Sequence, residues 1–210
     1  MANAGETLAI GVKNYGGTET FTNVATTSYS QAAVLFTTGS SNTSALVYCW
    51  KNTGGTGTGN CDDLAVERIS TPSNVLTNAG FETGSLSPWT RSGSGAQSNV
   101  VASNARTGTY SLQTGAATSG VEQSATGLTA GSTYLLAGWA KVANGSEQVA
   151  VGVKSFGGTE TYLRTSSTAY SQQPIFFTTG STNTSAAVYC YKDAGSSAGY
   201  CDDYTLIKLS

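Results

Sequence analysis

The sequence AIGVKNYGGTETF…TTGSSNTSALVYCWK at residues 9–51 returns at residues 150–192 as AVGVKSFGGTETY…TTGSTNTSAAVYCYK, with a constant offset of 141. Of the 43 aligned positions, 26 are identical. A Cys-Asp-Asp triplet follows each copy, at residues 61–63 and 201–203, whereas the stretch from Asn74 to Val142 has no counterpart. A period of this length indicates a structural unit of about 140 residues. The chain therefore reads as the second half of one unit followed by one whole unit.

Alternating side chains predict β-strands along most of the chain. In residues 148–154, Val149, Val151 and Val153 share one side, which we expect to face a core, while small and polar residues share the other side. Gly-rich turns separate such short strands, a pattern typical of antiparallel sandwiches and barrels. We therefore predict an all-β protein, an antiparallel β-sandwich in tandem with an incomplete first copy.

The repeat also predicts the domain organisation. Residues 1–70 form the second half of a sandwich, residues 71–73 a linker, and residues 74–210 a complete module. We expect 74–142 to pair with 143–210, because this pairing needs no chain crossing; the alternative pairs 74–142 with the first half-unit. Either way one half-unit is left over with an apolar inner face. Domain-swapped self-association through residues 1–70 would cover that face.

Composition excludes several kinds of partner. The chain has ten Lys and Arg against twelve Asp and Glu, and no histidine. Such a balance gives no electrostatic attraction to nucleic acid or to an anionic membrane, and no apolar run approaches the roughly 20 residues of a membrane span. The absence of histidine also weakens most acid–base and nucleophilic schemes, so we do not expect an enzyme.

The four cysteines form two local pairs at equivalent places in the two copies. Without histidine or CxxC spacing they do not suggest a metal site, so we predict the disulfides Cys49–Cys61 and Cys190–Cys201. Disulfides are typical of secreted proteins. No signal peptide precedes them, and we therefore expect the chain to be a fragment of a longer secreted protein.

Five further pieces of sequence carry a family resemblance. They are NVLTNAGFETG at 74–84, Trp89, ARTGTYSL at 105–112, GLTAGSTY at 127–134 and CDDYTL at 201–206. Their order and spacing resemble the calcium-bearing jelly-roll carbohydrate-binding modules that are appended to xylanases, glucanases, mannanases and alginate lyases. The resemblance covers 74–210 as a whole module and 3–70 as the second half of another.

The resemblance implies a structural calcium ion that joins the first and last strands. Calcium prefers six to eight oxygen ligands. Glu82 together with Asp202 or Asp203 would supply carboxylates, and Asp202 is expected to point inward. Carbonyls near Asn78 and in the turn at Thr107 would complete the shell. The alternative is a solvated acidic pair at the start of a strand.

The resemblance also implies a sugar-binding face built from aromatic and polar side chains. Trp89 follows a proline in a loop, where such modules often carry a stacking tryptophan; a core tryptophan is the rival interpretation. Tyr191 replaces Trp50 of the first copy, so an aromatic ring is present in both. Across the same face we expect four more residues: Tyr162, Glu160, Lys154 and Gln148. Trp139, within an apolar strand, is expected in the core.

These observations favour a non-catalytic module that holds an attached enzyme on a polysaccharide. The ligand class stays open among β-glucan, mannan, xylan and alginate. The alternative is a structural or adhesive tile of a secreted surface protein without a sugar site. The tile hypothesis predicts that Trp89 and Tyr191 are buried or far apart.

Overall fold

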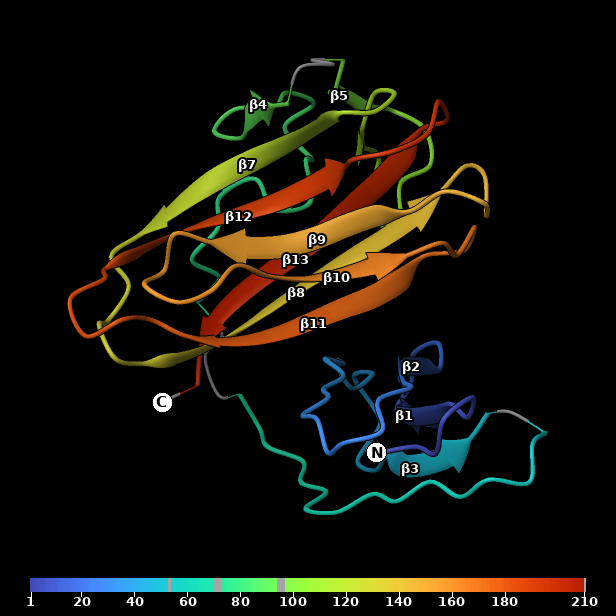
Figure 1. The fold of residues 1–210 in the computed structure, drawn as a ribbon. Helices are drawn as coiled ribbons and strands as arrows, with labels where there is room; N and C mark the ends of the chain where they lie inside the picture. Colours follow the sequence, from blue (N-terminus) through green and yellow to red (C-terminus); the bar gives the residue numbers. More distant parts are fainter. Residues whose placement is uncertain (53, 70–72, 94–96, 210) are drawn as a thin grey trace. The chain divides into compact units, whose positions relative to one another are not determined.

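The computed structural model describes residues 1–210 except 53, 70–72, 94–96 and 210 (Figure 1). The chain divides into two compact units, Met1–Pro72 and Ser73–Ser210. Most of the expected linker 71–73 lies outside the described residues. In the part of the chain that is described, no helix is long and apolar enough to cross a membrane.

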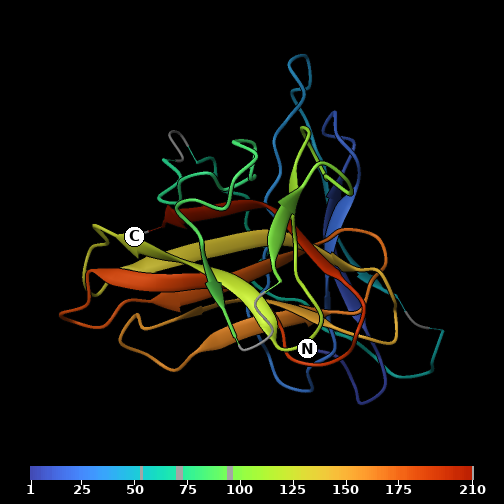
Figure 2. The same ribbon diagram turned by 90° about the horizontal axis from the view of Figure 1, so that it is seen from above.

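The second unit consists of two five-stranded antiparallel sheets. The first sheet has the order β10 (Thr161–Thr165), β9 (Val149–Lys154), β12 (Ser185–Lys192), β7 (Ser119–Thr126), β4 (Thr90–Ser92). The second has the order β11 (Ser171–Thr178), β8 (Thr133–Val142), β13 (Gly199–Lys208), β6 (Ser111–Gln113), β5 (Asn99–Val101). The long strands of the two layers run in roughly the same direction (Figures 1 and 2), as in aligned sandwiches. The predicted antiparallel β-sandwich is confirmed.

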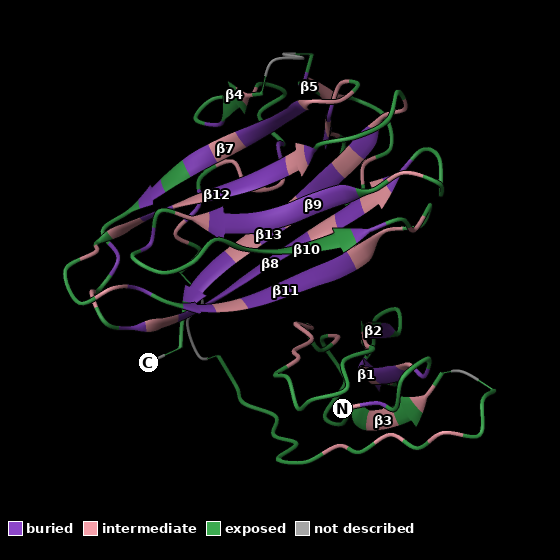
Figure 3. Ribbon diagram, in the orientation of Figure 1, coloured by how far each residue is buried: buried purple, intermediate pink, exposed green. Residues whose placement is uncertain are grey.

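Both sheets combine strands from 74–142 with strands from 143–210. β7 lies between β4 and β12, and β8 lies between β11 and β13. The core fills the space between the sheets (Figure 3). Val149, Val151 and Val153 of β9 are fully buried there, as the alternation predicts. The disulfide Cys190–Cys201 joins β12 to β13 and thus ties one sheet to the other.

Trp139 departs from the sequence prediction. It is half-buried on β8 rather than part of the core, and the Arg106 guanidinium lies 3.6 Å from its ring centroid. Gly138 and Ala140, its neighbours, face inward, where the Tyr204 ring lies over Gly138. The strand is apolar on both sides, so its alternation does not reveal which side packs inward.

The first unit contains one three-stranded sheet, in the order β2 (Thr20–Val24), β1 (Leu8–Lys13), β3 (Leu46–Lys51). At the offset of 141, these are the counterparts of β10, β9 and β12, in the same order. Residues 61–69 correspond to β13, yet they form no strand, and Leu64 and Val66 are exposed. The reason is that β8 and β6, the partners of β13, have no counterpart here. The predicted disulfide Cys49–Cys61 is present.

Candidate functional site

The outer face of the sheet β10–β9–β12–β7–β4 carries a row of tyrosines. Tyr162 in β10 and Tyr189 in β12 lie opposite Gly152 in β9, one on each side of it. Tyr191 lies two residues further along β12, opposite Gly120 in β7. Because paired residues and residues two apart share a face, all three rings project away from the valine core. We call Tyr162, Tyr189 and Tyr191 the tyrosine row.

Glycines let two of these rings lie against the sheet. A side chain at Gly152 would collide with the Tyr189 ring, and one at Gly120 would collide with the Tyr191 ring. Tyr189 is consequently buried, whereas Tyr162 is 46% exposed and Tyr191 is half-buried. Burial raises the pKa of Tyr189, and a hydrogen bond to Glu160 raises it further. The tyrosine row is therefore held in place from beneath and accessible from solvent at Tyr162 and Tyr191.

Charged side chains flank the tyrosine row in ion pairs. Lys154 Nζ lies 2.7 Å from Glu122 Oε2 and 5.7 Å from the centroid of the Tyr189 ring. The Arg164 guanidinium pairs with Asp193 and lies 4.9 Å from the ring centroid of Tyr162. Its hydrogen bond to Asp193 lowers the pKa of that carboxyl group. The face thus offers fixed donors and acceptors beside aromatic rings.

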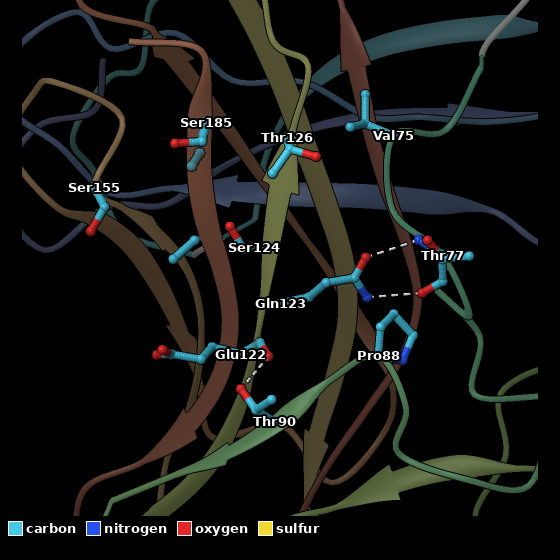
Figure 4. A pocket seen from close by; sticks show the side chains of 12 residues that line it. Val75, Thr77, Pro88, Thr90, Glu122, Gln123, Ser124, Thr126, Ser155 and Ser185 are labelled. Atoms are coloured by element: carbon cyan, nitrogen blue, oxygen red, sulfur yellow. Dashed lines mark hydrogen bonds between the residues drawn. The ribbon is translucent and has the colours of Figure 1, made fainter.

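A depression of about 490 Å³ is lined by residues of β7 and β12 and by Thr90 of β4 (Figure 4). One of them, Glu122, lies opposite Tyr189 in the neighbouring strand, so the depression adjoins the tyrosine row. Gln123 is among its lining residues, and its side-chain amide accepts from the Thr77 N–H at 2.9 Å and donates to the Thr77 carbonyl at 2.8 Å. Glu122 belongs both to the depression and to the Lys154 pair. The polar side chains that line it include Thr77, Thr90, Glu122, Ser124, Thr126 and Ser185. Their hydroxyl and carboxylate groups match the hydrogen-bonding edges of a polyol.

Trp89 does not belong to this face, and its interpretation as a stacking residue is wrong. The side chain is 3% exposed and packs against Phe81 and Tyr204, at ring-centroid distances of 5.3 and 5.0 Å. Its indole N–H donates to the Asn78 carbonyl at 3.1 Å. The Trp89 N–H also bonds to the Leu86 carbonyl, so the loop turns inward and places the ring in the core.

The other expected sugar-binding residues are placed as follows. Tyr162, Tyr191 and Lys154 lie on one face, and Glu160 reaches it through its bond to Tyr189. Gln148 is exposed just before β9, at a position that alternates with Val149. Their role in binding stays a prediction.

Sequence reasoning missed four residues of this face. Tyr189 and Arg164 each lie two residues from a predicted sugar-binding residue, Tyr191 and Tyr162 respectively. Residues two apart in a strand share a face, so the alternation in the sequence could have identified both. Glu122 and Asp193 lack such a signal, because they reach the face through strand pairing and through the turn after β12.

The expected calcium ligands gather around one turn. The Glu82 carboxylate accepts the N–H groups of Thr109 and Tyr110, at 2.9 and 3.0 Å. Asp203 accepts the Thr107 hydroxyl and pairs with Arg106 at 2.8 Å. A group added at Gly80 would touch Asp203, Asp202 and Glu82. The two aspartate carboxylates therefore lie beside Gly80, whereas Glu82 approaches Gly80 through its Cγ atom and its carboxylate lies beside Gly108.

Asp202 does not point into the core, contrary to the sequence expectation. It pairs with the outward-facing Trp139, and the register shift in β13 between Asp202 and Thr205 separates it from the core residues Tyr204 and Leu206. Asp202 is nevertheless fully buried, beside the backbone of Arg106. It accepts the N–H groups of Arg106 and Asp203 at 2.8 Å each. Burial raises the pKa of Asp202 to about 7, while those hydrogen bonds lower it and the Asp203 charge raises it. Among the described residues, Asp202 has no cationic partner.

The fit to a metal ion is incomplete. Within the described ranges, no three Asp, Glu, His or Cys side chains are placed to hold one ion together. The Asn78 carbonyl accepts both the Phe81 N–H and the Trp89 indole N–H, which uses its two lone pairs. The Asn78 carbonyl itself is therefore already engaged, and a ligand from another carbonyl near Asn78 stays a prediction.

Comparison with known proteins identifies the family. A family profile described as a carbohydrate-binding domain, CBM_4_9, matches residues 73–195, which is 123 of the 210 residues. The chain belongs to this family. The matched region of this CBM_4_9 protein is a binding domain, not a catalytic one.

One curated relative shares substantial sequence. The CBM_4_9 protein is 44% identical over 136 residues to a keratan-sulfate endo-1,4-beta-galactosidase of Sphingobacterium multivorum. The alignment covers 64% of this chain and 31% of that enzyme, so the chain spans about a third of its relative's length.

Solved structures share the fold. The module TmCBM61 in complex with β-1,4-galactotriose is 25% identical, with a TM-score of 0.53, and the alignment covers 65% of this chain and 99% of that one. A family 16 carbohydrate-binding module has the same identity and TM-score, with 64% and 99% covered. The CBM22-1 xylan-binding domain from Paenibacillus barcinonensis Xyn10C is 19% identical, with a TM-score of 0.52 and coverage of 66% and 96%, which shows the fold alone.

Proposed function

We propose that residues 73–210 bind a glycan that contains β-linked galactose, and that the outer face of β10–β9–β12–β7–β4 is the binding surface. The observation that carries this proposal is the tyrosine row. It lies between two ion pairs and is continuous with a polar depression. Ligand sites commonly combine aromatic side chains with a few precisely placed polar groups.

The chemistry of this face suits a pyranose ring. A sugar presents C–H groups on its faces and hydroxyl groups along its edges. Tyr162 and Tyr191 offer accessible aromatic surface for the C–H groups, and aromatic rings bury much area at little entropic cost. Lys154 and Arg164 donate to hydroxyl oxygens, while Glu122 accepts from hydroxyl groups. Because these charges are already paired, their side chains are oriented before a ligand arrives.

The relatives favour galactose among the possible sugars. The 44% identical relative is named for keratan sulfate and a 1,4-β-galactosidic bond, and TmCBM61 is bound to β-1,4-galactotriose. In β-galactose the axial 4-hydroxyl leaves C–H groups together on one ring face, which gives an apolar patch for a tyrosine. None of the four polysaccharide classes expected from the sequence has a backbone of β-linked galactose. We therefore propose galactan and keratan sulfate as ligands in place of β-glucan, mannan, xylan and alginate.

The module would act by holding an attached enzyme on its polysaccharide outside the cell. The curated relative is about three times longer than the matched stretch, and it is an enzyme. The two disulfides are typical of an extracellular protein. Binding at the tyrosine row would raise the local concentration of substrate without any chemical step.

Calcium at the Gly80 turn is a separate part of the proposal. Glu82, Asp202 and Asp203 would hold the ion together with oxygens of Thr107. The buried Asp202 carboxylate, which has only N–H donors, is the observation that supports a cation there. Arg106 would have to release Asp203. The ion would fix the first and last strands and stay out of the sugar site.

The alternative hypothesis of a structural tile without a sugar site is supported by one observation and opposed by another. Trp89 is buried, as that hypothesis predicts, whereas Tyr191 is accessible and shares a face with Tyr162. The family to which the chain belongs also binds carbohydrate, which favours the sugar-binding proposal.

Affinity electrophoresis tests the proposed function. The wild-type chain is run in gels that contain β-1,4-galactan, keratan sulfate or xylan, beside Tyr191→Ala. We expect retardation by a galactose-containing polymer, and at least about a tenfold loss of affinity in the variant. Tyr200→Ala is the matched control, because Tyr200 is equally half-buried but lies in the other sheet. Retardation by none of the polymers, or the same loss in both variants, would contradict the proposal.

A further inference from the structure

The small sheet of the first unit carries an aromatic face of its own. Phe21 in β2 and Tyr48 in β3 lie opposite Gly11 in β1, one on each side. Trp50 lies two residues further along β3, opposite Ala9. By alternation these three rings share one face of the sheet. We call Phe21, Tyr48 and Trp50 the first-unit aromatic row.

This row repeats the tyrosine row in register as well as in sequence. Tyr162, Gly152 and Tyr189 are paired as Phe21, Gly11 and Tyr48 are. The third ring of each row also occupies a matching position, since Tyr191 and Trp50 both lie opposite an alanine of the central strand. Each pair of counterparts is separated by 141 residues. The strand pairing thus places aromatic residues at matching points on both sheets, although Phe21 and Trp50 stand where the second unit has tyrosines.

The contacts beneath the rings are repeated too. A side chain at Gly11 would collide with the Tyr48 ring, as one at Gly152 would with Tyr189. The Tyr48 hydroxyl donates to Glu19 Oε1 at 2.7 Å, and Lys13 Nζ lies 5.5 Å from the ring centroid. Glu19 and Lys13 are the counterparts of Glu160 and Lys154. Burial raises the pKa of Tyr48 to about 12, and the hydrogen bond to Glu19 and the charge of Glu19 contribute to this increase.

The outer rings are more accessible here than in the second unit. Trp50 is 66% exposed and Phe21 is 42% exposed. Large aromatic side chains that gather in the open on one face mark a binding surface. Exposure on this scale is unfavourable in water, so the rings gain when a ligand covers them.

The two faces also differ in three respects. Asn23 stands in place of Arg164, and the sheet lacks counterparts of β7 and β4, which supply Glu122 and the polar depression. The first-unit face is therefore a stacking platform with fewer polar walls, in which a tryptophan replaces a tyrosine. Stacking area would carry most of its affinity.

We propose that the first-unit aromatic row is a second binding site for the same class of galactose-containing glycan. The proposal rests on the proposed function of the second unit, because the chemistry is transferred between matching residues. A protein surface is the other possible occupant of an exposed aromatic face. The repetition of Glu19 and Lys13 around Tyr48 favours the sugar, since a hydrophobic docking face needs no oriented charges.

Two sites on one chain predict tighter binding to a polymer than to a short oligosaccharide. The second contact becomes intramolecular, which typically increases apparent affinity by about 10²- to 10⁴-fold where both sites reach one chain. A short galacto-oligosaccharide would instead fill the two sites independently and report their number.

Titration calorimetry with the whole chain and β-1,4-galactotriose, or a keratan-sulfate oligosaccharide, counts the sites. We expect two per wild-type chain, one in Trp50→Ala, one in Tyr191→Ala and none in the double variant. Trp50→Tyr, which installs the residue type of the second unit, should keep both. Tyr29→Ala is the matched control, because Tyr29 is exposed in the first unit but lies outside its sheet. Thermal melting of each variant confirms folding, and Trp50 contributes little packing at its exposure.

The outcomes separate the two proposals. One site in the wild type, lost in Tyr191→Ala and unchanged in Trp50→Ala, overturns the second site and leaves the proposed function intact. No binding by the wild type overturns both. If Trp50→Ala instead abolishes self-association measured by light scattering, without changing the number of sugar sites, the face binds protein and the second-site proposal is wrong.

Discussion

The Tyr189 ring lies over Gly152, the residue directly opposite it in the neighbouring strand. The same relationship joins Tyr48 to Gly11 in the first unit. A glycine at the centre of a β-strand is destabilising by itself. Such a glycine occurs twice in this chain, each time beneath a tyrosine whose hydroxyl group bonds to a glutamate. We infer that the glycine is there because it leaves room for the tyrosine ring to lie against the sheet.

Gly152→Ala should therefore displace Tyr189 and weaken glycan binding. A methyl group at this position collides with the ring, and overpacking of this kind typically costs about 1–3 kcal/mol of stability. We expect a lower melting temperature and weaker retardation in galactan gels. Gly145→Ala is the control, since a methyl group there meets only ordinary contacts. Equal affinity of Gly152→Ala and wild type would show that the ring position is irrelevant to binding.

The buried ion pair between Lys192 and Glu147 makes stability depend on pH. Lys192 Nζ is fully buried, 2.5 Å from Glu147 Oε2. The hydrogen bond from Lys192 lowers the Glu147 pKa from 4.5 to about 2, with further help from Ser196 and Ser197 against an opposing effect of burial. Because the folded-state pKa is depressed, the contribution of Glu147 is complete above pH 4.5 and is lost as the pH falls toward 2.

Urea unfolding between pH 7 and pH 2.5 measures this dependence. The wild type should lose stability below pH 4.5, and Glu147→Gln should be less stable at pH 7 with a flatter profile in that range. Glu67→Gln, which alters an exposed carboxylate of the first unit, should keep the wild-type profile. A Glu147→Gln profile parallel to that of the wild type would exclude Glu147 as the source.

Trp89→Ala should destabilise the sandwich without altering the sugar site directly. Loss of a buried tryptophan typically costs about 3–5 kcal/mol, and it also removes the donor to the Asn78 carbonyl. Trp89→Phe keeps most of the packing against Phe81 and Tyr204. Galactan retardation by Trp89→Phe should match the wild type at a temperature where both are folded. Loss of retardation in a fully folded Trp89→Phe would restore the stacking role.

Trp89 also marks the limit of what the sequence predicts. The alternation in β9 correctly assigns Val149, Val151 and Val153 to the core, because only one of its sides is apolar. A proline and turn residues before Trp89 indicate a loop, but they do not reveal whether the loop folds back over the core. Trp139 shows the converse, since its strand is apolar on both sides and its ring lies beneath Arg106.

The candidate site was predictable to the extent that it follows alternation. Tyr162, Lys154 and Tyr191 lie on one face because of their spacing, and Tyr189 follows the same rule. Glu122 depends on how β7 is registered against β12, which is a contact between residues that are distant in sequence. Residues 61–69 illustrate the same dependence: they match a strand in sequence and form none, because their partner strands are missing.

Calcium should stabilise the second unit through Glu82, Asp202 and Asp203. An ion present at about 100 times its dissociation constant adds about 2.7 kcal/mol to the stability of the folded state. For a unit of this size, that corresponds to a rise in melting temperature of about 5–10 °C. The comparison is between the EDTA-treated chain and the same chain after addition of calcium chloride, followed by differential scanning calorimetry.

Two variants test whether a calcium-dependent rise in melting temperature comes from the proposed calcium site. Glu82→Gln should abolish the calcium-dependent shift, because the ion loses one of its three proposed carboxylates while the oxygen of the new amide still accepts from the Thr109 N–H. Glu122→Gln, which changes a carboxylate on the sugar face, should keep the shift. If the melting temperature is the same with EDTA and with calcium, the carboxylates of Glu82, Asp202 and Asp203 serve only their hydrogen bonds to residues 106–110, and the proposed ion is wrong.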